Sequence, residues 1–190
     1  MFDNFINIIK TKYGVSVIQK GFSQGNCEQR KTMNNLIINN FDNIMKDCYA
    51  NFLIYYILIK YEIKNFTEIL PILEKIEGNI VEYCKNKYSA SVIEKCCERG
   101  KKEIIEHILK YLIDNHSESI IDILLNSYGI YIIKKALKIE NKDIKEKIMI
   151  KIIENLNKIK KSNNGAKIIE NLSHEFIEFN YLLNQKIIEK

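Results

Sequence analysis

The chain has 190 residues, 46% of them hydrophobic, and its 29 basic against 24 acidic side chains give a formal charge of +5. This composition supplies one continuous hydrophobic core and excludes a disordered chain. A single proline and seven glycines leave few helix breakers, so we expect an all-α protein. The charge excess would help binding to a polyanion but is too small to indicate one.

The N-terminal segment does not have the pattern of an export signal. Its first ten residues, MFDNFINIIK, place an acid near the start and the only lysine at the end, the reverse of a signal peptide. The longest apolar run, residues 52–59, has less than half of the roughly 20 residues that a transmembrane helix needs. We therefore expect a cytoplasmic or, alternatively, nucleolar protein with no membrane partner.

An internal repeat is the strongest feature of the sequence. Each copy has an aromatic or polar residue, a small residue, two variable positions, two aliphatic residues and a polar or aromatic residue. The copies are residues 13–19, 49–55, 88–94, 128–134 and 164–170. They recur at intervals of 36, 39, 40 and 36 residues, which is the range of helical solenoids.

The repeat pattern predicts how each copy packs in a stacked array. The small residue is expected to permit close approach of a neighbouring helix. The leading tyrosine and the aliphatic pair are expected to form a buried stripe, and the two variable positions are expected to be exposed.

A second helix is predicted between successive copies, because apolar residues recur at helical spacing in residues 69–76 and 104–109. A polar run at residues 114–119 is interpreted as a loop, and it would account for the 40-residue interval. Two pairs fit the pattern of a helix capping box: Asn26 with Gln29, and Asn115 with Glu118.

The five cysteines are odd in number and irregularly spaced: Cys27, Cys48, Cys84, Cys96 and Cys97. A disulfide framework is therefore not predicted, and a reducing compartment fits. A zinc site could be drawn from Cys84, Cys96, Cys97 and His107, but these residues contain no CxxC pair. Buried structural thiols are the prediction, with no metal and no cofactor.

Four tracts resemble the Pumilio (PUF) family. KNKYSASVIEKC, residues 85–96, looks like the family's penultimate repeat, and DCYANFLIYYIL, residues 47–58, has the opening of other PUF repeats. EGNI at residues 77–80 and KKSNNGAKIIENL at residues 160–172 are similar to features of its C-terminal half. The resemblance spans residues 9–175 and implies a right-handed α-solenoid, a short curved stack that forms one domain over residues 1–190. Eight repeats are usual in the family, and five are visible here.

The resemblance also implies a mode of RNA binding. In this family each repeat presents three side chains, of which the first and third contact one base edge and the second stacks between bases. Carried onto this sequence, the triplets are Val15, Ser16 and Gln19; Asn51, Phe52 and Tyr55; Ala90, Ser91 and Glu94; Ile130, Tyr131 and Lys134; and Ala166, Lys167 and Glu170.

Several of these residues depart from the family's pattern. Val15, Ala90, Ile130 and Ala166 offer no hydrogen bond to a base edge, and Tyr55 and Lys134 replace the customary Gln or Glu. We therefore expect degenerate base specificity.

Lysines offer a second way to hold RNA. Residues 134–161 contain ten lysines against four acids, a local excess larger than the charge of the whole chain. Such a patch could track phosphates, although a solvated helix surface would have the same composition. Lysines on the helices predicted to face RNA are better placed: Lys20, Lys95, Lys135 and Lys167.

The sequence gives no support to catalysis or to a small-molecule substrate. It contains no GxxxxGK, HExxH or GxSxG motif, and the three histidines are far apart. The predicted function is RNA binding, on single-stranded or structured RNA, in post-transcriptional and translational regulation or in association with ribosomes. The alternative is a protein-binding scaffold within a ribosomal or other ribonucleoprotein assembly, with ribosomal or regulatory proteins as partners. Apolar Val15, Ile130 and Ala166 suit a protein partner, whereas the lysine excess favours RNA.

Overall fold

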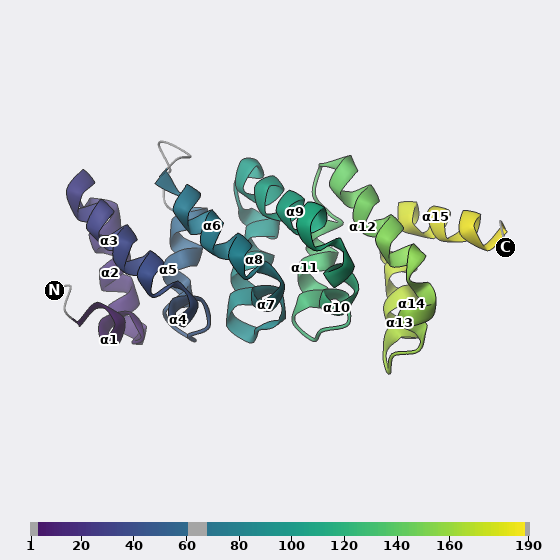
Figure 1. Cartoon of the computed structure of the whole chain (residues 1–190), viewed down its shortest axis with the longest axis horizontal. Helices are drawn as coiled ribbons and strands as arrows, with labels where there is room; N and C mark the ends of the chain where they lie inside the picture. Colours follow the sequence, from purple (N-terminus) through teal and green to yellow (C-terminus); the bar gives the residue numbers. More distant parts are fainter. Residues whose placement is uncertain (1–3, 61–67, 189–190) are drawn as a thin grey trace.

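The computed structural model describes residues 4–60 and 68–188. Within these ranges every regular element is a helix, and the helices follow one another in a stack from the N-terminus to the C-terminus (Figure 1). The predicted all-α solenoid is confirmed. None of the helices in the described ranges is long and apolar enough to cross a membrane.

In the described residues each repeat contains three helices, one more than the sequence pattern predicted. A short helix comes first: α1 (Phe5–Ile9), α4 (Phe41–Met45), α7 (Ile80–Lys85), α10 (Ile120–Leu124) and α13 (Leu156–Lys160). The helix that carries the repeat motif comes second, and these helices are called the α2 row: α2 (Lys12–Gln24), α5 (Asn51–Tyr55), α8 (Lys87–Arg99), α11 (Gly129–Ala136) and α14 (Gly165–Glu175). The third helices form the α3 row: α3 (Cys27–Asn39), α6 (Leu70–Gly78), α9 (Lys102–His116), α12 (Lys142–Glu154) and α15 (Ile177–Ile188).

The rows run side by side along the stack. Figure 1 shows α3, α6, α9 and α12 in front, with the α2 row behind them and the short helices along one edge. In the α2 row, α2 contacts α5, α5 contacts α8, and α8 contacts α11. In the α3 row, contacts continue from α3 through α6, α9 and α12 to α15. The predicted second helices at residues 69–76 and 104–109 are thus confirmed as α6 and α9.

Two short helical turns also lie in the part of the chain that the structure describes. A π-helical turn, η2 (Tyr56–Lys60), continues α5, and a 3₁₀ turn, η4 (Ser117–Ser119), joins α9 to α10. The predicted loop at residues 114–119 is wrong, because α9 extends to His116 and the 3₁₀ turn follows directly. The longer interval between the third and fourth copies therefore comes from a long helix.

Of the two predicted capping boxes, one is confirmed. Asn26 accepts a hydrogen bond from the backbone of Gln29, and the Gln29 side chain accepts one from the backbone of Asn26. The pair at Asn115 and Glu118 is wrong as a cap. Asn115 lies inside α9 and donates to the carbonyl of Tyr111 at 3.1 Å.

The small residue of each motif packs against the short helix of its own repeat. A Cβ atom built on Gly14, Gly129 or Gly165 would overlap the carbonyl oxygen of the residue six positions earlier. At Gly129 it would also lie 3.1 Å from the carbonyl oxygen of Cys84 in the preceding repeat. The predicted close approach of a neighbouring helix is confirmed, and the neighbour is the short helix that the pattern did not reveal.

A polar side chain three residues before the small residue caps most of the motif helices. The oxygens of Thr11, Asp47, Asn86 and Asn126 accept hydrogen bonds of 2.8–3.4 Å from the backbone amide of the small residue. Asx and Thr side chains favour this position because they satisfy amides that have no partner within the helix. Sequence reasoning missed this recurring signal.

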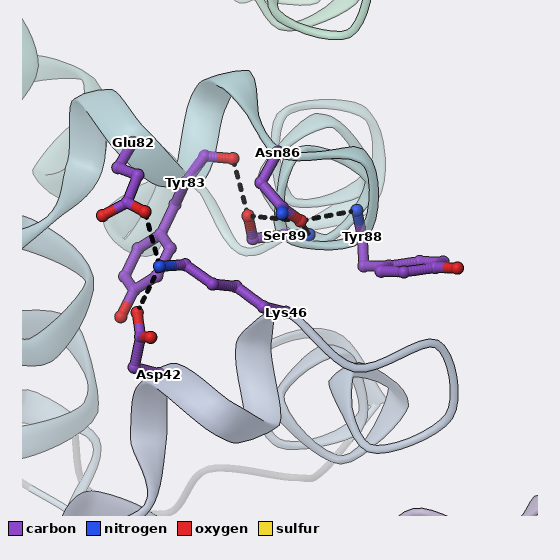
Figure 2. Close-up of polar contacts among 7 residues, drawn as sticks. All are labelled: Asp42, Lys46, Glu82, Tyr83, Asn86, Tyr88 and Ser89. Atoms are coloured by element: carbon purple, nitrogen blue, oxygen red, sulfur yellow. Dashed lines mark hydrogen bonds and ion pairs between the residues drawn. The ribbon is translucent and has the colours of Figure 1, made fainter.

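An ion-pair cluster links the second and third repeats. Figure 2 shows Lys46, which follows α4, extending between Asp42 of α4 and Glu82 of α7. Its Nζ lies 2.8 Å from Asp42 Oδ1 and 2.5 Å from Glu82 Oε1. These hydrogen bonds raise the pKa of Lys46 to about 12. Burial raises the pKa of the neighbouring Tyr83 phenol to about 12 as well.

Candidate nucleic-acid interface

The helices of the α2 row bury one side and expose the other. In α11, Gly129, Ile132, Ile133 and Ala136 are buried at helical spacing. Side chains on the opposite side follow Tyr131 at intervals of three and four residues, which places them on one face of the helix. We call this face of the row the exposed stripe: Ser16, Gln19 and Lys20; Phe52 and Tyr55; Ser91, Glu94, Lys95 and Glu98; Tyr131, Lys134, Lys135 and Lys138; and Lys167 and Glu170.

The leading tyrosines do not belong to the core, so that part of the sequence prediction is wrong. Tyr13 is 77% exposed and Tyr128 is 40% exposed. Each of these two tyrosines directly precedes the first buried residue of its helix. The aliphatic pair is buried as predicted in most copies, and Val17, at 53% exposed, is the exception.

The first variable position is also placed differently from the prediction of exposure. Val15, Asn51 and Ala90 are buried, Ile130 is half-buried, and only Ala166 is exposed. In α2 the reason is visible in the spacing, because Val15, Ile18 and Phe22 lie three and four residues apart on the buried side. Asn51 uses its side-chain amide internally, donating to the carbonyl of Asp47 at 2.5 Å.

The second variable position lies on the exposed stripe. Phe52 is 40% exposed and Tyr131 is 54% exposed. Ser16 and Lys167 are exposed too, and Ser91 is half-buried. The stripe therefore presents two aromatic faces, separated by one repeat with a serine, that could stack against planar groups.

The third position lies between neighbouring helices of the row. Gln19 donates from its side-chain amide to the carbonyl of Phe52 at 2.8 Å, which ties α2 to α5. Tyr55, Glu94 and Lys134 are half-buried at the equivalent place in their repeats.

Lys95 joins the aromatic part of the stripe. Its ammonium lies 5.6 Å from the centre of the Phe52 ring and 5.2 Å from that of Tyr55, a cation–π arrangement between α8 and α5. No carboxylate of the described residues lies within 4.0 Å of the Lys95 ammonium, so Lys95 can still pair with a phosphate.

In the folded chain, most of the lysines in residues 134–161 are paired with acids. Seven of its ten lysines lie within 4.0 Å of a carboxylate: Lys134, Lys135, Lys138, Lys145, Lys147, Lys151 and Lys158. Most of the acids come from outside that range, so a count along the sequence overestimates the free positive charge. Elsewhere on the stripe, Lys20 and Lys167 are exposed, and no carboxylate of the described residues lies within 4.0 Å of either.

Three of the paired lysines lie on the exposed stripe. Lys134 Nζ is 2.9 Å and Lys138 Nζ is 2.5 Å from the carboxylate of Glu175, at the end of α14. Lys135 Nζ is 3.2 Å from Glu98 of α8. The hydrogen bond from Lys138, and then that from Lys134, lowers the pKa of Glu175, and the bond from Lys135 lowers the pKa of Glu98.

From the sequence, Glu98 and Glu175 were interpreted as ordinary helix-surface carboxylates, and their pairing with these lysines was not predicted. Lys135 is 37 residues from Glu98, and Lys134 is 41 residues from Glu175. Only an alignment of the repeats could have predicted that these acids lie beside the lysines. Each acid lies nine or ten residues after the small residue of its own copy.

The cysteines contribute no ligands to the face. Cys84, Cys96 and Cys97 are buried, as predicted, and Cys27 and Cys48 are exposed. Burial raises the pKa of each of the three buried thiols, that of Cys97 to about 12. In the part of the chain that the structure describes, no group of three or more His, Cys, Asp or Glu residues could hold a metal ion.

Comparison with curated proteins finds similar proteins that are named Pumilio homologs. Pumilio homolog 12 of Arabidopsis thaliana is 27% identical over 170 residues, which are 88% of this chain and 27% of the relative. Pumilio homology domain family member 4 of Saccharomyces cerevisiae is 27% identical over 142 residues, 74% of this chain and 16% of the relative. No family model matches the sequence.

Solved structures share the fold. The chain superposes with a TM-score of 0.77 on PUF-8 in complex with PBE-RNA, at 19% identity, over 93% of this chain and 51% of that one. It superposes with a TM-score of 0.76 on the Puf4 RNA-binding domain bound to an HO endonuclease RNA, at 20% identity, over 95% and 54% of the two chains. The predicted resemblance is confirmed, and the chain spans about half of these solved domains and less than a third of the curated relatives.

Proposed function

We propose that this chain, which has the Pumilio-type helical-repeat fold, binds single-stranded RNA along the exposed stripe of the α2 row. The observation that carries the proposal is the alternation of aromatic faces and cations on that stripe. Phe52 and Tyr131 can stack bases, while Lys20, Lys95 and Lys167 can reach phosphates. The structures of PUF-8 and Puf4 bound to RNA support the same use of the fold.

The proposed binding is weakly selective for base sequence. Val15 and Ala90 are apolar and buried, so neither offers a hydrogen bond to a base edge in its repeat. The side-chain amide of Gln19 already donates a hydrogen bond to the carbonyl of Phe52. Stacking and phosphate pairing remain, and both depend little on base identity.

A cellular role follows from the same proposal. The relative mRNA-binding protein PUF3 of Saccharomyces cerevisiae is 29% identical over 101 residues, 48% of this chain and 12% of the relative. We propose post-transcriptional regulation as the process and the cytoplasm as the compartment. The free cysteines support the compartment, because reducing conditions keep thiols in that state.

Charge reversal on the stripe tests RNA binding. The double variant Lys20→Glu/Lys167→Glu changes two exposed lysines without a carboxylate partner, and we expect it to weaken affinity for a short single-stranded RNA by about tenfold or more. Fluorescence anisotropy at 100 mM salt is a suitable measurement, with 100 mM chosen as roughly physiological. Circular dichroism should show that both helices remain.

The matched control is Lys110→Glu/Lys142→Glu, which makes the same change in net charge on α9 and α12 of the α3 row, at two exposed lysines without a carboxylate of the described residues within 4.0 Å. We expect it to weaken binding by less than about threefold, through the long-range field alone. Equal losses in the two variants would show that binding does not use the stripe, and absence of binding by the unmodified chain would refute the function.

A further inference from the structure

We infer that Glu98 and Glu175 limit the RNA affinity of the exposed stripe by holding the lysines of α11 and its following turn in ion pairs that a phosphate must break. This inference rests on the proposed function. It identifies two acids as determinants of affinity, and neither of them is itself a group that would contact RNA.

The geometry places the two acids on either side of the same lysines. Glu98 comes from α8 and binds Lys135, whereas Glu175 comes from α14 and binds both Lys134 and Lys138. All three lysines are on the stripe, and each is bound across a boundary between repeats. The fourth repeat, which is the richest in cations, therefore has its positive charge neutralised from both neighbours.

The charge balance sets the size of the effect. Three ammonium groups and the guanidinium of Arg99, whose Nε lies 3.8 Å from Glu98, face two carboxylates, so the cluster carries a net charge near +2. A phosphate that approaches Lys134 also approaches Glu175, and like charges at that distance repel each other. Binding then requires the lysines to exchange a carboxylate partner for a phosphate, which gains little free energy compared with pairing a free lysine.

Other cations on the stripe lack this restraint, which makes the fourth repeat distinctive. The exposed Lys20 and Lys167 have no carboxylate within 4.0 Å among the described residues, and Lys95 rests on aromatic rings. Contact with phosphates is therefore expected to be strongest at the unrestrained lysines and weak at α11, although α11 carries more positive charge.

The test uses Glu175→Gln, which keeps the shape of the side chain and removes its charge. We expect RNA affinity at low salt to rise by about three- to tenfold, and the slope of log affinity against log salt to steepen by about 0.7 for each lysine that gains a phosphate. Glu98→Gln is expected to act in the same direction with a smaller effect, because it releases one lysine. The control Glu154→Gln removes an exposed acid from α12 and so makes the same change in net charge away from the cluster.

A second readout does not depend on RNA. Acetylation of the free protein, followed by mass spectrometry, should show faster modification of Lys134 and Lys138 in Glu175→Gln than in the unmodified chain. If the unmodified chain binds RNA and loses affinity in Lys20→Glu/Lys167→Glu, but Glu175→Gln binds no tighter than Glu154→Gln, the inference is overturned and the proposed function stands. Unchanged lysine reactivity would overturn it as well, whereas absence of binding by every variant would remove the proposed function itself.

Discussion

The hydroxyl of Ser89 donates a hydrogen bond of 2.8 Å to the carbonyl oxygen of Tyr83, six residues earlier (Figure 2). At the equivalent position of three other repeats, a glycine places its backbone close to the corresponding carbonyl oxygen: Gly14, Gly129 and Gly165. The third repeat thus accommodates a side chain by turning it into a hydrogen-bond donor. At Gly14, Gly129 and Gly165 the short helix and the motif helix approach too closely for a side chain.

This packing predicts the effect of filling the small position. Gly129→Leu should lower the free energy of unfolding by about 1–3 kcal/mol or more, because the new side chain displaces the carbonyls of Ile123 and Cys84. Gly78→Ala is the control, since its Cβ atom meets nothing within 4 Å and alanine favours a helix. Denaturant unfolding measures both variants, and equal stabilities would contradict the packing described.

The Lys46 cluster predicts a loss of stability at alkaline pH. Lys46 and Tyr83 have folded pKa values of about 12, above their ordinary values of 10.5 and 10.0. A raised folded pKa means that the unfolded chain releases its proton first, so this stability is complete below pH 10 and is lost as the pH rises towards 12. Denaturant unfolding between pH 8 and about pH 11 measures the loss.

Removing the phenol separates the two contributions. Tyr83→Phe keeps the buried ring and eliminates its titration, so its stability should fall less steeply between pH 10 and about pH 11. A slope equal to that of the unmodified chain would show that the buried phenol does not contribute. Lys46→Met should cost about 1 kcal/mol at neutral pH, the upper range for a partly exposed pair.

Thiol accessibility provides an independent check of the core. Cys27 and Cys48 are exposed, whereas Cys84, Cys96 and Cys97 are buried with raised pKa values, so their thiolates are scarce. In the folded protein, a thiol reagent at pH 8 should label Cys27 and Cys48. It should label the three buried cysteines only after unfolding. Rapid labelling of Cys96 in native conditions would contradict its position.

Stacking on the exposed stripe predicts a loss of affinity that does not depend on base identity. Phe52→Ala and Tyr131→Ala should each weaken binding of single-stranded RNA by about 1–3 kcal/mol. Tyr181→Ala is the control, because this tyrosine is 63% exposed but lies on α15 of the α3 row. Isothermal titration with two RNAs of different sequence measures the loss, and a strong dependence on sequence would argue against simple stacking.

The sequence predicted the fold because one pattern recurs at solenoid spacing. Gly14, Gly129 and Gly165 marked the motif helices correctly. The pattern predicted the wrong burial for the leading tyrosines and for Val15. The copies were aligned by residue type, without assigning each position to a side of the helix. The short helices were missed because five or six residues are too few to show helical periodicity.

The candidate face was predicted less completely than the fold. Phe52 and Tyr131 were found from the repeat register, and the structure places them on the exposed stripe. Glu98 and Glu175 were missed because their lysine partners lie in other repeats, so no local window contains both. A count of charges along the sequence cannot detect ion pairs that form only when neighbouring repeats pack against each other.

Competition binding at two salt concentrations tests RNA binding on the exposed stripe most directly. Short single-stranded RNAs of different sequence should compete with randomised RNA within about a hundredfold of one another, because stacking and phosphate pairing dominate. Log affinity should fall with log salt at a slope of about −0.7 for each phosphate contacted. Strong discrimination with a flat salt response would contradict the degenerate specificity, and absence of binding at either salt would contradict RNA binding itself.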